Sequence, residues 1–287
     1  MTMFEGFTLT TMDTGEATIR VRYGGSGAPL LLLHGHPQTH YIWHKIAPRL
    51  ARDFTVVCAD LRGYGESSKP PTTPDHAPYS KRVMALDQIE VMRQLGFERF
   101  YVAGHDRGGR VGYRMALDHP ERVIRLAVMD IVPTYEAYHR GGMEFGLGYW
   151  HWYFLAQPYP LPENMIGANP DNYYFHNTRH LFDPEALADY LRCVHNLETI
   201  HAMCEDYRAG ATLDYQYDEA DKGKKKIAAP VLALWGGRAS VAKWYDVLAV
   251  WREWADDVQG QALDCGHYLP EEAPDDTYTE LRRFFKL

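Results

Sequence analysis

The sequence predicts an α/β fold with a mostly parallel central sheet, helices on both faces and an inserted helical cap. Three observations predict it. Short apolar runs such as PLLLL at 29–33 and FTVVCA at 54–59 end abruptly in polar or turn residues, as buried parallel strands do. Stretches of helical character at 79–95 and 107–117 alternate with such runs. One apolar run, RFYVA, leads into a glycine-rich turn that opens a helix.

The other elements follow in order along the chain. Two short strands with a glycine-rich turn are expected at the N-terminus, and later buried strands over VIRLAVMD and VLALWGG. The alternation stops at about Thr134 and resumes at Ile227, and the intervening segment is rich in aromatic residues. We interpret residues 134–226 as a cap inserted between two parts of one core, residues 1–133 and 227–287. A cap over the strand ends would exclude water from chemistry beneath it.

Composition limits the classes of partner. The 287 residues carry a formal net charge of -8, which argues against nucleic acid and requires a local positive patch for an anionic substrate. The N-terminus has no signal-peptide pattern, and no run approaches the ~20 apolar residues that span a bilayer. We therefore expect a cytoplasmic protein without a membrane partner. A homodimer is expected only because homodimers are the commonest oligomers of soluble proteins. Four cysteines without metal-site spacing are expected to be reduced thiols: Cys58, Cys193, Cys204 and Cys265.

The main candidate catalytic motif is the pentapeptide from Gly104 to Gly108, with Asp106 at its centre. Its strand–turn–helix setting and its glycine spacing match the nucleophile elbow of the α/β-hydrolase fold, with Asp in place of Ser. The turn would place Asp106 at a helix N-terminus, where backbone N–H groups stabilise negative charge. The alternative is an ordinary turn in which Asp106 caps the helix.

Two further segments complete this pattern. The loop HGHP, which includes His36, follows the third apolar strand and would supply a backbone N–H to the oxyanion hole, together with the N–H of Arg107. His267 near the C-terminus would be the general base. The triad acid has two candidate positions: Asp130 at the end of VIRLAVMD, and Asp246, which falls on a predicted helix. We choose Asp130, although it could also serve as a simple turn residue.

Two arginines stand beside the nucleophile. Arg107 and Arg110 are three residues apart on the helix that Asp106 opens, so their side chains project from neighbouring positions. Such arginines could be a surface pair; the functional interpretation is a fork for a substrate carboxylate. Two unit charges ~4 Å apart repel by about 4 kcal/mol at an effective dielectric of 20, so an anionic nucleophile that attacks an anionic substrate needs this compensation.

With these residues in view, the chain resembles the fluoroacetate dehalogenases, also called haloacetate dehalogenases, of the α/β-hydrolase superfamily. The resemblance covers nearly the whole chain and is carried by HGHPQ, FTVVCADLRGYGESSKP, AGHDRGGRVGYRMALDHP, MDIVPTYE, WHWYFLAQP, CEDYRAGA and CGHYLPEEAPD. It implies Asp106 as nucleophile, His267 as base and Asp130 as its partner, with the substrate carboxylate on Arg107 and Arg110. No metal or organic cofactor is implied.

The resemblance also implies a halide site in the cap, formed by His151, Trp152 and Tyr207. Fluoride accepts hydrogen bonds strongly, so three converging donors would stabilise the charge on the departing ion; without the resemblance these residues would be interpreted as aromatic packing. Two residues depart from the family pattern. His36 stands where Phe is usual and puts a titratable ring near the pocket, and Gly109 stands where alanine is common.

The implied reaction has two steps: Asp106 displaces halide to form an ester, and His267 activates the water that hydrolyses it.

Epoxide hydrolases also use an elbow aspartate, and they usually need two cap tyrosines as acids, for which Tyr207 is one candidate; Tyr135, Tyr138, Tyr149 and Tyr153 are others. Haloalkane dehalogenases typically have Trp directly after the nucleophile, where this chain has Arg107. A non-catalytic binding protein would often lack a triad member, and none is missing here.

Overall fold

The computed structural model describes residues 3–286, in which one mixed sheet organises the core. The eight strands lie in the order β1-β2-β4-β3-β5-β6-β7-β8. The pairs β1–β2 and β2–β4 are antiparallel, and every later neighbouring pair is parallel. The strands are β1 Thr8–Asp13, β2 Thr18–Gly25, β3 Ala28–Leu33, β4 Phe54–Ala59, β5 Phe100–His105, β6 Val123–Met129, β7 Val231–Gly236 and β8 Val258–Leu263.

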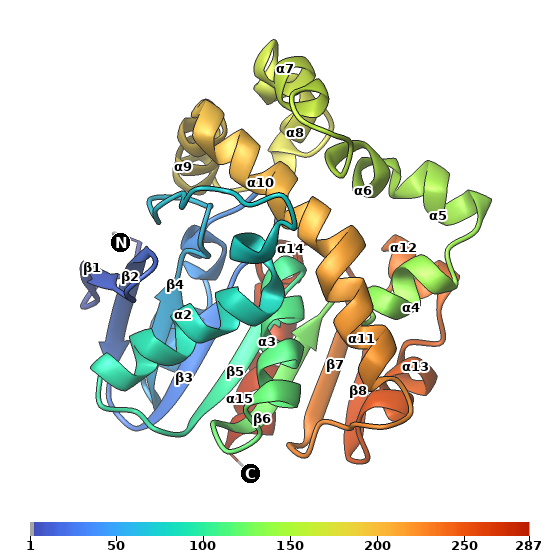
Figure 1. Ribbon diagram of the computed structural model, residues 1–287. Coiled ribbons are helices and arrows are strands. Elements are labelled where there is room, and N and C mark those ends of the chain that lie inside the picture. The colour runs from blue at the N-terminus through green and yellow to red at the C-terminus, as the bar shows by residue number, and fades with distance from the viewer. Residues whose placement is uncertain (1–2, 287) are drawn as a thin grey trace.

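Helices cover both faces of the sheet, as Figure 1 shows. Two separate apolar clusters account for this layering: one contains side chains of α2, α3 and α13, and the other contains side chains of α1 and α15. Central strands such as β3 contribute to both clusters, because alternate leucines point to opposite faces. The core helices are α1 Ala47–Leu50, α2 Lys81–Gln94, α3 Arg107–Asp118, α12 Ser240–Trp244, α13 Val247–Trp254, α14 Leu269–Glu272 and α15 Pro274–Phe285.

The segment between β6 and β7 is helical throughout its regular parts. Its helices α5 to α10 form a layer above one end of the sheet in Figure 1, while α4 and α11 lie beside the core. The division at residues 134 and 226 stays a prediction. These helices are α4 Thr134–His139, α5 Met143–Gly148, α6 Trp150–Leu155, α7 Leu161–Gly167, α8 Pro170–Phe175, α9 Pro184–Val194, α10 Leu197–Ala209 and α11 Tyr215–Asp221, with a π-helical turn at Gly210–Asp214.

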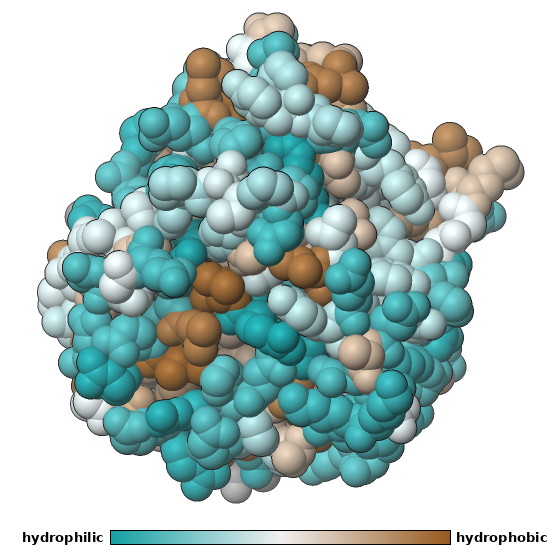
Figure 2. Space-filling model, viewed as in Figure 1, coloured by the Kyte–Doolittle hydropathy of each residue, from teal (hydrophilic) through white to brown (hydrophobic). Residues whose placement is uncertain are grey.

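The surface in Figure 2 is mainly hydrophilic; hydrophobic residues show at the outer tips of the upper helical layer and also in patches lower on the same face. The exposed apolar side chains there include Met143 and Leu147 of α5 and Met165 of α7. Within residues 3–286, no helix combines the length and apolar character needed to cross a membrane. The four cysteines are buried free thiols, which agrees with the expectation of reduced cysteines.

Candidate active site

Asp106 lies in the sharp turn between β5 and α3, with φ 48° and ψ -116°. Non-glycine residues rarely adopt positive φ, and such strain concentrates at functional positions. The flanking glycines are required by close backbone packing: a Cβ on Gly104 would lie 2.4 Å from the Gly108 oxygen, and a Cβ on Gly108 would lie 2.4 Å from the His34 oxygen. The Asp106 side chain makes no capping hydrogen bond to α3, so it is not an ordinary helix cap.

The Asp106 carboxylate is held by the loop after β3. The backbone N–H of His36 donates to Asp106 Oδ1 at 2.9 Å, which makes this N–H the predicted donor of the HGHP loop. Burial disfavours the charged carboxylate, but His267, His105 and the nearby arginines outweigh it and hold the pKa of Asp106 well below its usual range. Asp106 is therefore ionised at neutral pH; its Oδ1 accepts the His36 N–H, and its Oδ2 accepts no hydrogen bond within residues 3–286.

His267 and Asp130 form the expected base–acid pair. His267 Nδ1 lies 2.6 Å from Asp130 Oδ2, and donation from Nδ1 to this carboxylate leaves Nε2 of the neutral ring without a proton. Asp130 has φ 53° and directly follows β6, and its Oδ1 accepts a hydrogen bond from the Gly236 N–H at 2.9 Å. Burial lowers the pKa of His267, but the hydrogen bond and charge of Asp130 and the charge of Asp106 outweigh it, so the net pKa is raised.

The two arginines differ in their surroundings. Arg107 is buried and paired with Asp206 of α10: Nε donates to Asp206 Oδ2 at 2.9 Å, and Nη2 donates to Oδ1 at 2.7 Å and to the backbone oxygen at 2.9 Å. Arg110 Nη1 donates to the Val132 oxygen at 3.0 Å and to Thr134 Oγ1 at 3.2 Å. The arginines are therefore not a free fork, since a buried guanidinium needs partners inside the protein.

These bonds leave part of each guanidinium unused. Within residues 3–286, neither Arg107 Nη1 nor Arg110 Nη2 makes a hydrogen bond. The Arg107 Cζ lies 4.1 Å from the centre of the Tyr207 ring, and the Arg110 Cζ lies 4.4 Å from the Trp152 ring. Both charges also lower the pKa of Asp106. Two cations thus stand behind the Tyr207 and Trp152 rings, close enough to Asp106 to affect its charge.

A cavity of about 400 Å³ opens above the elbow. Six of the predicted site residues line it: Asp106, His36, His151, Trp152, Tyr207 and His267. Asp130, Arg107 and Arg110 stand behind this lining. The structure therefore gathers residues from the β3 loop, the elbow, α6, α10 and the C-terminal loop around one space.

The three predicted halide ligands lie together in this cavity. The Tyr207 ring centre is 5.9 Å from that of His151 and 6.1 Å from that of Trp152. No hydrogen bond to another described residue occupies these three side chains. Burial and the charge of Asp106 raise the pKa of Tyr207 well above its usual value, so the phenol keeps its proton. Burial lowers the pKa of His151 to about 4, so its ring is neutral and carries one N–H.

Sequence reasoning did not identify Asp206. Its carboxylate contacts Arg107, the Lys81 ammonium and the Tyr64 hydroxyl, the last at 2.6 Å. The available sequence signal was the position of Asp206 directly before Tyr207 in the segment CEDYRAGA. Asp246, the rejected candidate for the triad acid, instead caps α13: its side chain accepts a hydrogen bond from the Ala249 N–H at 3.0 Å.

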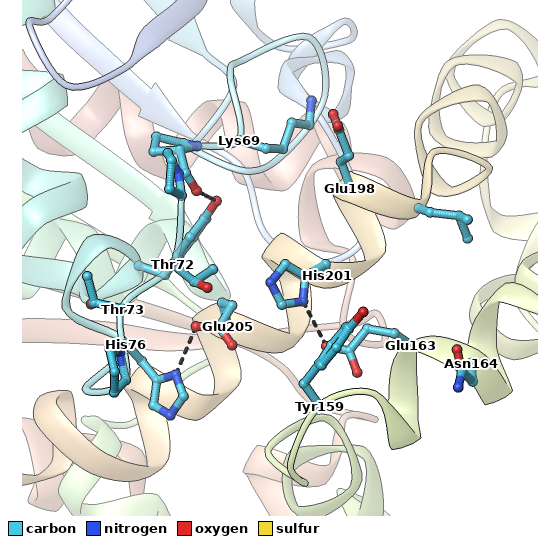
Figure 3. Close-up of a pocket in the computed structure, with 15 residues that line it drawn as sticks. Lys69, Thr72, Thr73, His76, Tyr159, Glu163, Asn164, Glu198, His201 and Glu205 are labelled. Atoms are coloured by element: carbon cyan, nitrogen blue, oxygen red, sulfur yellow. Dashed lines mark hydrogen bonds and ion pairs between the residues drawn. The ribbon is translucent and has the colours of Figure 1, made fainter.

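A second cleft, of about 840 Å³, lies between the loop of residues 69–79 and α10, and Figure 3 shows its lining. Its charged groups are largely paired with each other: His76 Nδ1 is 2.8 Å from Glu205 Oε2, and His201 Nδ1 is 2.9 Å from Glu163 Oε1 (Figure 3). None of the predicted site residues lines it. The elbow cavity is therefore the candidate active site, although it is the smaller of the two.

Comparison with known proteins agrees with this geometry. The model of the alpha/beta hydrolase fold family matches residues 28–274. A fluoroacetate dehalogenase from Burkholderia sp is 47% identical, over 98% of this chain and 95% of that protein. A soluble epoxide hydrolase from Corynebacterium sp. (strain C12) is 34% identical, over 91% of each. The crystal structure of ALR0039 from Nostoc sp PCC 7120 superposes with a TM-score of 0.97 at 56% identity, over 99% of both chains. The chain thus belongs to the alpha/beta hydrolase fold family, among relatives that include fluoroacetate dehalogenase.

Proposed function

We propose that the protein is a hydrolytic dehalogenase of small 2-haloacids, such as fluoroacetate or chloroacetate. The observation that carries this proposal is the pair of buried cations, Arg107 and Arg110, on the helix that begins after the nucleophile. A carboxylate nucleophile repels an anionic substrate, and cations within a few ångströms offset that repulsion. The identity to the Burkholderia fluoroacetate dehalogenase supports the same substrate class.

In the first step, Asp106 Oδ2 attacks the carbon that bears the halogen. The carbon–halogen electron pair leaves with the halide, and an ester forms between Asp106 and the acid. The His36 N–H on Oδ1 orients the carboxylate for this attack. The N–H and O–H donors of His151, Trp152 and Tyr207 stabilise the departing halide, as donors in an oxyanion hole stabilise a developing charge.

In the second step, His267 Nε2 removes a proton from water, and the resulting hydroxide attacks the carbonyl carbon of the Asp106 ester. Asp130 holds the imidazole in the tautomer that this step requires and stabilises the imidazolium that forms. Collapse of the intermediate releases a 2-hydroxy acid and restores the carboxylate. The balance is one haloacid and one water converted to one hydroxy acid, one halide and one proton.

Epoxide hydrolysis is the second candidate. Tyr149 and Tyr207 both line the cavity, and burial raises the pKa of each well above its usual value, so both could donate a proton to an opening epoxide. The 34% identity to the Corynebacterium epoxide hydrolase supports this alternative. Hydrolysis of a neutral epoxide, however, gives no role to the charges of Arg107 and Arg110.

The deciding experiment measures halide release from fluoroacetate and chloroacetate beside diol formation from a neutral epoxide, with one enzyme preparation. We expect halide and the 2-hydroxy acid in equal amounts, and little diol. Rapid diol formation without halide release would reject the dehalogenase and favour the epoxide hydrolase.

A further inference from the structure

The imidazole of His36 lies in the wall of the elbow cavity without a partner. Its Nδ1 is buried and has no hydrogen bond, and Nε2 makes none within residues 3–286. The ring packs edge-on against Tyr207 and Tyr174, with centres 5.1 and 5.3 Å away. Because the backbone N–H of the same residue binds Asp106 Oδ1, this ring stands next to the reacting centre.

The ring is a neutral hydrogen-bonding group. Burial, with the neighbouring His151, lowers the pKa of His36 to about 3. A neutral imidazole has one N–H donor and one acceptor nitrogen, and a hydroxyl, which both donates and accepts, can pair with Nε2 in either tautomer. Tyr173 and Tyr174, which line the same cavity, also bury hydroxyls that have no partner. Buried polar groups are almost always satisfied, so such a cluster indicates a ligand or water that completes it.

The cavity has room for more than a two-carbon acid. Its volume of about 400 Å³ is within the range of about 300–1,000 Å³ that holds drug-sized ligands. In the proposed reaction the free guanidinium nitrogens of Arg107 and Arg110 hold the carboxylate, and the donors of His151, Trp152 and Tyr207 hold the halogen. The reacting carbon of a substituted 2-haloacid carries one further group, and the His36 imidazole, which lines the cavity and has no hydrogen-bond partner within residues 3–286, is available to contact it.

We propose that His36 forms a third recognition point, which binds a hydroxyl-bearing substituent on the reacting carbon of a 2-haloacid. This inference rests on the proposed dehalogenase function and specifies its substrate class. An alkyl substituent of the same size would leave the imidazole unsatisfied in a desolvated wall. A site built to hydrogen-bond a substrate group rejects the analogue that lacks it more strongly than a hydrophobic pocket distinguishes sizes.

The test compares two substrates of equal size and the same configuration, 2-chloro-3-hydroxypropanoate and 2-chlorobutanoate, by chloride release. We expect the wild-type kcat/KM to favour the hydroxy acid, and His36→Phe to reduce that ratio at least tenfold, which is about 1.4 kcal/mol. The ratio within one enzyme cancels general damage to folding or chemistry. A wild-type preference for 2-chlorobutanoate, or an unchanged ratio in His36→Phe, would overturn the proposal.

Two variants serve as controls. His176→Phe makes the same chemical change at an exposed histidine of the cavity lining and should leave the ratio at the wild-type value. His36→Gln keeps a donor and an acceptor and should retain part of the preference for the hydroxy acid. A ratio as low as that of His36→Phe would show that the preference depends on the shape of the side chain and not on its hydrogen bonds.

Inhibition provides a second readout that does not depend on turnover of the larger acids. We expect 3-hydroxypropanoate to inhibit chloroacetate turnover more strongly than butanoate in the wild type, and the difference to vanish in His36→Phe. If chloroacetate is hydrolysed but neither larger acid is a substrate or an inhibitor, the subsite is absent while the dehalogenase stands. If no halide is released from chloroacetate either, the proposed function itself fails.

Discussion

Arg107 and Arg110 should respond differently to removal, because only Arg107 is part of a buried ion pair. Arg107→Met would leave Asp206 buried with fewer partners. Breaking a buried pair typically costs about 3–5 kcal/mol; Lys81 and Tyr64 still contact Asp206, so we expect about 3 kcal/mol of lost stability. Arg110 donates to neutral acceptors and its removal leaves no buried charge unpaired, so we expect a loss near the lower end for hydrogen bonds of a charged group, about 1.5 kcal/mol.

Substrate binding should suffer in both variants. A hydrogen bond to a charged group contributes about 1.5–3 kcal/mol, so each removal should reduce kcat/KM for chloroacetate by about 10- to 150-fold. Chloroacetamide has nearly the same size but no charge, and we expect a much smaller loss for it. The assays are chloride release from both compounds and the free energy of unfolding from urea denaturation.

Two results would refute this reasoning. Equal losses for chloroacetate and chloroacetamide would show that the arginines shape the helix and do not bind an anion. Equal losses of stability in Arg107→Met and Arg110→Met would show that the contacts of Asp206 do not stabilise the fold beyond those of a neutral acceptor.

Three further changes have defined outcomes. Asp130→Asn removes the main interactions that raise the pKa of His267. Only the neutral ring is a base, so kcat falls as the pH drops through this pKa, and in the variant the acid limb of the kcat–pH profile should move to lower pH. We also expect kcat to be lower by on the order of 10⁴. An unmoved acid limb, or an unmoved histidine signal in NMR titration, would contradict it. Trp152→Phe deletes one donor and should reduce kcat/KM for fluoroacetate by on the order of 10²-fold or more, but far less for bromoacetate; equal losses would make Trp152 a packing residue. His267→Asn should accumulate an ester on the Asp106 peptide, visible by mass spectrometry, and an adduct on any other carboxylate would count against the two-step scheme.

The sequence predicted the parts of the site that depend on local signals. The elbow glycines have to be small because backbone atoms approach within 2.4 Å of where their Cβ atoms would lie, so their spacing marked Asp106. Asp130 was recognisable because it directly follows a buried apolar strand, β6. His267 was chosen from its position in the chain order, and its ring does lie against Asp130.

Long-range pairing was not predictable in the same way. Arg107 and Asp206 are 99 positions apart, and nothing local says that a cap carboxylate neutralises the arginine beside the nucleophile. The lysine-rich segment DKGKKK before β7 contains Lys222, whose ammonium contacts Glu136 and Glu253, and no local signal in the sequence pairs these groups. Strand β8 has no continuous apolar run because it is an edge strand with exposed side chains.

In the proposed mechanism, Asp106 itself forms a covalent bond to the substrate. A single turnover in H₂¹⁸O, with enzyme in excess over chloroacetate, tests it on the unmodified protein. We predict that the oxygen of the new hydroxyl group comes from Asp106, so the released 2-hydroxy acid is unlabelled and one ¹⁸O appears in the Asp106 peptide. If the ¹⁸O appears in the hydroxy acid and Asp106 stays unlabelled, water attacks the carbon directly and Asp106 is not the nucleophile.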